Sequence, residues 1–116
     1  MSGLYSSVQV RVQSELRAGS SDWRYFALGD DLTPLGITVA SLVSVVVTRI
    51  DGTTLGPEDL QILTNPAPYV GSDQLTIYWK ETGSLVATYK ITVTVTTSDG
   101  RTLIYDCLQP VTNLLS

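Results

Sequence analysis

The sequence predicts an all-β fold, an antiparallel β-sandwich of about seven short strands. Val and Thr dominate the composition, and only 16% of the residues are charged and 8% aromatic, which favours strands over helices. Runs of alternating apolar and polar residues are separated by regularly spaced turn signals, a pattern typical of two packed sheets. The 116 residues suit a single domain, 1–116, that is large enough to bury a core without disulfides.

The N-terminal stretch predicts one half-buried strand within residues 4–14. Its apolar and polar residues alternate, with Val8, Val10 and Val12 on one face and Gln9, Arg11 and Gln13 on the other. A flexible Gly-Ser loop at residues 19–21 follows it. Residues 1–21 are therefore expected to form either an N-terminal arm or a strand docked on the body.

An aromatic cluster follows this loop at Trp23, Tyr25 and Phe26, with Arg24 among them. Three aromatic residues in four positions exceed what one face of a strand buries. Two interpretations stay open: the cluster closes one end of the core, or it anchors a subunit interface, where aromatic residues and Arg are enriched. Burial of these side chains distinguishes the two.

The middle of the chain predicts one long strand followed by irregular structure. Residues 37–50 read as a strand with apolar residues on both faces, which ends at the turn signal Asp51-Gly52. Residues 57–62 favour a short strand over a single helical turn. Residues 65–73 contain two prolines, which remove ladder donors, so we expect a surface loop that exposes Tyr69.

The last third predicts three consecutive antiparallel strands. Residues 74–80 place Leu75, Ile77 and Trp79 on one face. Residues 85–108 form two long runs around a predicted two-residue Asp99-Gly100 turn. The inward face of the first run carries Tyr89 and alternating aliphatic residues, and its outward face is rich in Thr. Such a strand invites pairing with another chain if it lies at a sheet edge. Residues 109–116 are expected to be a short tail.

Charge and composition argue against several classes of partner. The formal net charge is −4, and the basic residues are scattered, so the sequence offers no footprint for nucleic acid or an anionic membrane. No apolar run has the length of a membrane span, and no signal-like segment marks export. We therefore expect a soluble, non-secreted protein.

The residues that carry most enzyme chemistry are scarce. The chain has no His, and its single Cys107 allows no intrachain disulfide and is expected to be a buried thiol. Glu58-Asp59 is interpreted as a solvated loop rather than a catalytic pair. A second break is expected at Gly29-Asp30-Asp31. The aspartates near the glycine breaks, Asp22, Asp30 and Asp31, are interpreted as turn and cap residues rather than Ca²⁺ ligands. We expect no enzyme, no metal site and no cofactor.

A family resemblance adds to these observations. An inward Trp79 beside the Tyr89 strand is the kind of core used by immunoglobulin-like and fibronectin-like sandwiches. The segment TYKITVTVTTSDGRT (88–102), preceded by the Trp79 strand and by VVVTRIDGTTLGPEDLQI, resembles small immunoglobulin-like virion subunits of tailed bacteriophages, including fibre-tail adaptors.

The resemblance implies a structural protein of the virion, made in the host cytoplasm and joined to portal or neck, tail or fibre subunits as a homo-oligomer within the particle. The residues proposed for its interfaces are Trp23, Arg24, Tyr25, Phe26, Tyr69 and Arg101. A capsid decoration protein is the alternative within the virion. A fibronectin-type module that binds a ligand or carbohydrate is the alternative of another class.

Overall fold

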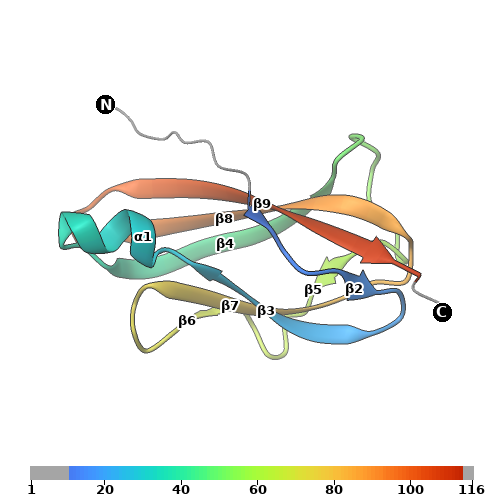
Figure 1. Cartoon of the computed structure of the whole chain (residues 1–116), viewed down its shortest axis with the longest axis horizontal. Coiled ribbons are helices and arrows are strands. Elements are labelled where there is room, and N and C mark those ends of the chain that lie inside the picture. The colour runs from blue at the N-terminus through green and yellow to red at the C-terminus, as the bar shows by residue number, and fades with distance from the viewer. Residues whose placement is uncertain (1–10, 114–116) are drawn as a thin grey trace.

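The computed structural model describes residues 11–113, which form two β-sheets packed against each other (Figure 1). This confirms the predicted all-β, two-sheet character. The strands are β1 (Arg11–Val12), β2 (Leu16–Arg17), β3 (Ser21–Ala27), β4 (Val39–Arg49), β5 (Gln61–Ile62), β6 (Tyr69–Val70), β7 (Thr76–Thr82), β8 (Ala87–Thr97) and β9 (Thr102–Thr112). A short helix α1 (Gly29–Leu32) and a 3-10 turn η2 (Thr33–Leu35) connect β3 to β4.

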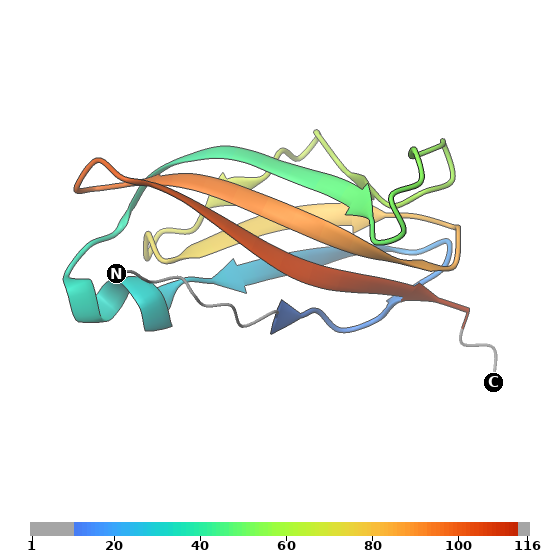
Figure 2. The same ribbon diagram turned by 90° about the horizontal axis from the view of Figure 1, so that it is seen from above.

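The first sheet has the strand order β1-β9-β8-β4, and β2 also pairs with β9. Both β1 and β2 run parallel to β9, whereas the other neighbours in this sheet are antiparallel. Figure 2 shows β4, β8 and β9 side by side along the length of the molecule. The second sheet has the order β3-β7-β5, and β6 also pairs with β7, all antiparallel.

The predicted hairpin of β8 and β9 is present, with Ile91 opposite Cys107. Its turn is longer than the predicted two residues. The Gly100 N–H donates to the Thr97 carbonyl over 3.0 Å, and the Thr97 N–H donates to the Arg101 carbonyl over 2.8 Å. Gly100 has φ +91°, and Asp99 keeps a negative φ. A positive φ at the last residue only, a glycine, is typical of the three-residue hairpin turn that ends in a G1 bulge.

The Thr-rich strand β8 would invite pairing with another chain only if it lay at a sheet edge. The strand lies between β4 and β9, so it is not a sheet edge, and its threonines are half-buried. The long strand at the edge of this sheet is β4, whose other side has no strand partner within residues 11–113.

The core lies between the two sheets and is made by the inward residues of the alternating strands. Trp79 and Tyr89 are the largest fully buried side chains, as the alternation predicts, and Cys107 is buried beside them. Each fully buried large apolar side chain stabilises the fold by roughly 1.5–3 kcal/mol. The other buried apolar residues are Leu16, Phe26, Leu28, Leu32, Val39, Val47, Leu60, Ile77, Ile91, Val93, Val95 and Val111.

Both ends of the described part of the chain are more regular than expected. Residues 11–21 of the possible arm are docked, because β1 and β2 pair with β9 and Leu16 is fully buried. The remaining residues of that segment, 1–10, lie outside the described part of the chain. At the other end β9 continues to Thr112, so residues 109–112 form strand rather than tail. Gln109 breaks the apolar alternation, yet its buried amide donates to the Ser14 carbonyl over 2.8 Å.

The loops contain three further differences from the predictions. Within residues 57–62 only Gln61–Ile62 is strand, and a turn precedes it. The loop 65–73 contains the short strand β6, because Tyr69 and Val70 follow the second proline and are free to pair with β7. The break predicted near residue 29 is the helix α1, which lies at the same end of the sandwich as the β8–β9 turn (Figure 1).

Candidate interaction surface

Strand β3 divides the predicted aromatic cluster between two faces. Trp23 and Tyr25 point away from the core and keep 45% and 59% of their surface exposed. Arg24 and Phe26 point inward and keep 7% and 2%. This corrects their assignment to one interface, because successive side chains of a strand point to opposite sides. The core interpretation holds for Phe26, and Trp23 and Tyr25 are the residues available to a partner.

The exposed aromatic residues of β3 join two tyrosines from neighbouring strands. Tyr78 of β7 lies opposite Tyr25 on one side and opposite Tyr69 of β6 on the other. The rings of Tyr69 and Tyr78 stack with centroids 5.2 Å apart, and Trp23 meets Tyr69 edge-on at 5.9 Å. Tyr25 and Tyr78 are 6.3 Å apart. We call these four residues the aromatic face.

A glycine allows this arrangement. Gly71 is buried directly after β6, and a Cβ placed there would lie 2.7 Å from Cε2 of Tyr78 and 3.3 Å from the Thr76 carbonyl oxygen. Both distances are shorter than ordinary van der Waals contact, so a side chain at residue 71 would displace the Tyr78 ring. The aromatic face therefore depends on close approach of the backbone to a ring.

A buried ion pair lies in the sandwich on the opposite side of β3 and β7. The Arg24 Nε donates to Oε2 of Glu81 over 3.0 Å, and the Trp79 Nε1 donates to Oε1 of the same carboxylate over 2.8 Å. The remaining Arg24 nitrogens donate to the Ser14 hydroxyl over 2.5 Å and to the Glu15 carbonyl over 3.1 Å. The guanidinium thus connects both strands to the segment between β1 and β2.

Electrostatics at Glu81 are set by burial. Desolvation raises the pKa of the Glu81 carboxyl, and the hydrogen bonds from Trp79 and Arg24 oppose that rise. A buried charge is tolerated only when it is paired and hydrogen-bonded, and both carboxylate oxygens have a donor. The network therefore holds β3 and β7, the main strands of the aromatic face, in fixed register.

The remaining predicted interface residues fall in different places. Tyr69 belongs to the aromatic face. Arg101 lies at the β8–β9 turn of the other sheet, where its guanidinium is 2.7 Å from the Asp99 carboxylate, and it does not approach the face. Sequence reasoning missed Tyr78 as a member, although its alternation with Trp79 already indicated an outward side chain.

A second polar cluster corrects the interpretation of Asp59. Its carboxylate is buried and accepts hydrogen bonds from the Gly56 N–H over 2.6 Å and from the Tyr89 hydroxyl over 2.7 Å, with the Arg49 guanidinium 3.7 Å away. These donors keep the pKa of Asp59 below its ordinary value, and desolvation raises that of Tyr89 to about 12. Asp59 is thus a structural anchor for the loop before β5, not a solvated residue.

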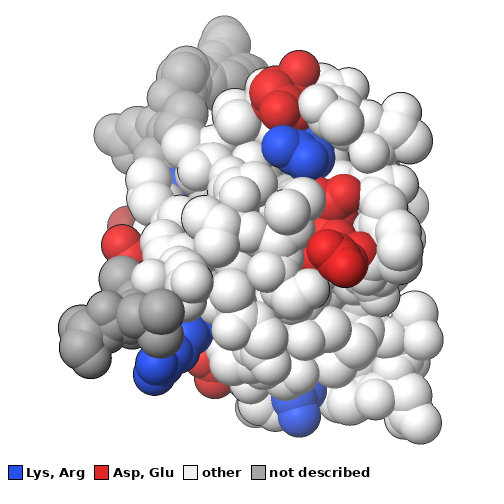
Figure 3. Space-filling model, turned by 90° about the vertical axis from the view of Figure 1, so that its right-hand side faces the viewer, with Lys and Arg blue, Asp and Glu red and all other residues white. Residues whose placement is uncertain are grey.

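Other chemistry is dispersed over the described residues. Asp22 lies on β3 whereas Asp30 and Asp31 lie on α1, and within residues 11–113 no three acidic or cysteine side chains gather into a possible metal site. Figure 3 shows the end of the molecule that carries β2 and β5, where the basic side chains lie apart from one another and acidic side chains lie beside some of them. Among residues 11–113, no helix is long and apolar enough to cross a membrane.

Comparison with known proteins adds no family to these observations. No protein-family model matches the chain, and no curated protein matches its sequence.

Proposed function

We propose that this chain is a non-enzymatic, immunoglobulin-like subunit of a tailed-bacteriophage particle, which joins other virion proteins through protein–protein contacts. The aromatic face is the observation that carries the proposal. It places Trp23, Tyr25 and Tyr69 at the surface as neighbours, and Trp and Tyr are the residues that most often dominate binding energy at protein interfaces. The chain acts in the virion after synthesis in the host cytoplasm.

The immunoglobulin-like type is supported by two details. The hydroxyl oxygen of Tyr89, near the start of β8, lies 3.3 Å from the Leu85 carbonyl oxygen, the position that the corner tyrosine of that fold occupies, although its proton is donated to Asp59. β1 and β2 pair with the same strand, β9, and β5 and β6 pair with the same strand, β7. If each of these pairs is counted as one interrupted strand, the two sheets contain seven strands. One detail differs from the usual immunoglobulin pattern: the fully buried Trp79 lies on β7, the fifth of these strands, and not on the third.

The aromatic face suits a protein partner because it is both exposed and rigid. Tyr69, Tyr78 and Trp23 brace one another by ring contacts, so their rotamers are ordered before a partner arrives. Ordering side chains in advance lowers the entropic cost of binding. The ring of Tyr25, the most exposed of the four, is the expected centre of the contact.

The proposal is tested on purified phage particles from the source of the chain. In one variant a photoreactive amino acid replaces Tyr25. In a matched control variant it replaces Val86, an exposed residue on the β7–β8 connection. Mass spectrometry is expected to find the chain in the particle, with cross-links to portal, neck, tail or fibre proteins from residue 25 and few from residue 86. Absence of the chain from the particles overturns the proposal. A map of the particle distinguishes an adaptor from a capsid decoration protein.

A carbohydrate-binding module is the second candidate, favoured by the stacked Tyr69 and Tyr78 rings and the exposed Trp23. Flat aromatic surfaces bind the apolar faces of sugar rings. A glycan array with the full chain tests this function. Binding that is lost in Trp23→Ala and kept in Val86→Ala supports it, and no binding to any glycan removes it.

A further inference from the structure

The strand β4 presents an unpaired backbone edge. Its register with β8 places Thr48 opposite Lys90 and Val46 opposite Thr92, and the Ile50 N–H donates to the Thr88 carbonyl over 3.2 Å. Hydrogen-bonding direction alternates along a strand, so the N–H and C=O groups of Val45, Val47 and Arg49 point away from β8. No other strand within residues 11–113 pairs with them.

The second half of β4 lacks the features that usually block an edge. Proteins protect edge strands with charges, prolines, bulges or a covering element. The strand contains no proline, and its one charged residue is Arg49 at its end, whose guanidinium is paired with Asp51 and lies near Asp59. Its two register shifts lie between Val39 and Ser44, so the pairing from Ser44 onward is regular. This half of the edge is therefore competent to accept another strand.

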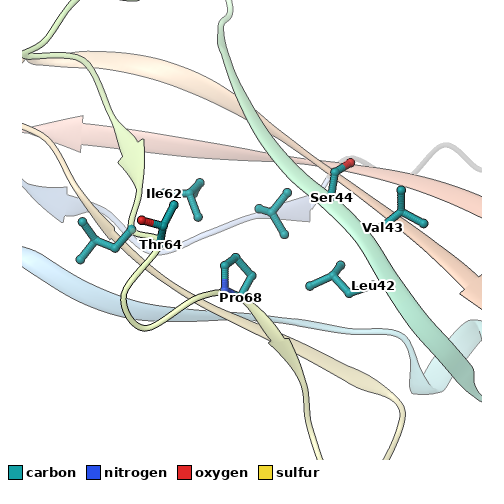
Figure 4. A pocket seen from close by; sticks show the side chains of 8 residues that line it. Leu42, Val43, Ser44, Ile62, Thr64 and Pro68 are labelled. Carbon is teal, nitrogen blue, oxygen red and sulfur yellow. The ribbon is translucent and has the colours of Figure 1, made fainter.

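A neutral groove lies beside this edge. Two hollows of about 330 and 310 Å³ share Val45 and Ile62 and extend along β4 opposite the β5–β6 segment. Figure 4 shows the first of them, between β4 and the segment that carries Ile62, Thr64 and Pro68. We call the two hollows together the β4 groove. None of the residues that line it is charged: Leu42, Val43, Ser44, Val45, Val46, Val47, Leu55, Leu60, Gln61, Ile62, Leu63, Thr64 and Pro68. The groove is suited to an uncharged, extended segment.

The chain itself contains a segment with this chemistry outside the described residues. Residues 4–10, LYSSVQV, carry no charge and alternate apolar with polar side chains at their end. At roughly 3.3 Å per residue an extended segment of this length spans about 23 Å, which is shorter than the 11-residue β4 at about 36 Å. A neutral segment entering a neutral groove loses no charge hydration on binding.

The topology favours a second copy as the source of this segment. Residues 4–10 precede β1, which lies at the opposite side of the first sheet from β4, with β9 and β8 between them. The segment of one copy would have to cross two strands to reach its own β4, whereas that of a neighbour would not. We propose that residues 4–10 of one copy add as a strand to β4 of a second copy, in a head-to-tail contact. Such contacts generate rings or filaments.

The test uses full-length variants that block either half of the contact. Val46→Lys places a charge on the unpaired edge strand beside the groove, at a side chain already 49% exposed, and blocks acceptance. Val8→Lys blocks donation. In size-exclusion chromatography with light scattering, the unmodified chain is expected to form oligomers, and each variant alone is expected to be a monomer. An equimolar mixture is expected to give a dimer, since Val46→Lys chains still donate and Val8→Lys chains still accept.

Control variants separate strand addition at β4 from a general effect of an added surface lysine. Val86→Lys, at a valine of similar exposure outside the groove, is expected to oligomerise like the unmodified chain. If Val46→Lys fails to fold, Val43→Lys is used in its place, because Val43 lines the other hollow. A monomeric unmodified chain, a Val8→Lys chain that still oligomerises, or a mixture that stays monomeric overturns the proposal. None of these results depends on the aromatic face or on a virion.

Discussion

The indole N–H of Trp79 donates a 2.8 Å hydrogen bond to Oε1 of Glu81, two residues further along β7, and both side chains are fully buried. Residues two apart in a strand share a face, so the carboxylate points into the core beside the indole. Arg24 of β3 completes the group from the opposite strand. A charged network therefore occupies the interior beneath the exposed aromatic face.

Breaking this network is expected to destabilise the fold strongly. Glu81→Ala leaves the guanidinium of Arg24 and the indole N–H of Trp79 buried without their acceptor, and removing one partner of a buried ion pair costs about 3–5 kcal/mol. The free energy of unfolding, measured by urea denaturation, is expected to fall by that amount. Arg24→Ala is expected to cost a similar amount.

The double variant Arg24→Ala with Glu81→Ala is expected to lose less than the sum of the two single changes, because both remove one shared interaction. Arg101→Ala serves as the control, since its pair with Asp99 is solvent-exposed and such pairs contribute about 0–1 kcal/mol. Fully additive losses at Arg24 and Glu81 would show that the two residues act independently.

Local alternation was sufficient to predict the hairpin and much of the core. In β8 the apolar residues Ile91, Val93 and Val95 alternate strictly with threonines, and only one face of such a strand can be buried. The same period placed Trp79 inward. These features depend on neighbours in the sequence, so no knowledge of the other sheet was needed.

The candidate site depended on contacts that the sequence does not reveal. In β3 both faces carry an aromatic residue, so alternation separates Trp23 and Tyr25 from Phe26 without deciding which face is buried. The buried face is the one that carries Arg24 and Phe26. Arg24 can be buried there because Glu81, 57 positions further along the chain, accepts its hydrogen bond. A charged residue at the inward position of β7 is understandable only once its partner is known.

Stability is expected to decline in acid in part because of Asp59. Its pKa lies below the ordinary value of 3.8, chiefly because the Gly56 N–H and then the Tyr89 hydroxyl donate to the ionised carboxylate. A carboxyl with a lower pKa in the folded state binds fewer protons there than in the unfolded chain. Its contribution to stability is therefore present above pH 3.8 and is lost as the pH falls through the folded-state pKa.

Urea unfolding of the unmodified chain and of Asp59→Asn between about pH 5 and pH 2 tests this dependence. The variant is expected to be less stable near pH 5 and to lose less stability as the pH falls, because residue 59 no longer titrates. Tyr89→Phe, which removes one donor, is expected to change the slope in the same direction by a smaller amount. An unchanged slope in Asp59→Asn would contradict the assignment.

The thiol of Cys107 is expected to be unreactive in the folded protein. The side chain is fully buried in the core, and desolvation raises the pKa of the thiol to about 11, so little of the reactive thiolate is present near neutral pH. A colorimetric disulfide reagent at about pH 8 is expected to react only as urea unfolds the chain. Rapid reaction without denaturant would indicate that β9 opens locally.

Phe26 and Tyr25 offer a matched pair for separating the core from the aromatic face, since they are neighbours on β3 with opposite orientations. Phe26→Ala removes a buried ring and is expected to lower the free energy of unfolding by about 3–5 kcal/mol. Tyr25→Ala removes only a cross-strand contact with Tyr78 and is expected to lower it by about 0.2–1 kcal/mol. Urea denaturation of both variants measures the difference. Equal losses would mean that Tyr25 supports the fold as much as Phe26 does, which would leave it less suited to serve as a binding residue.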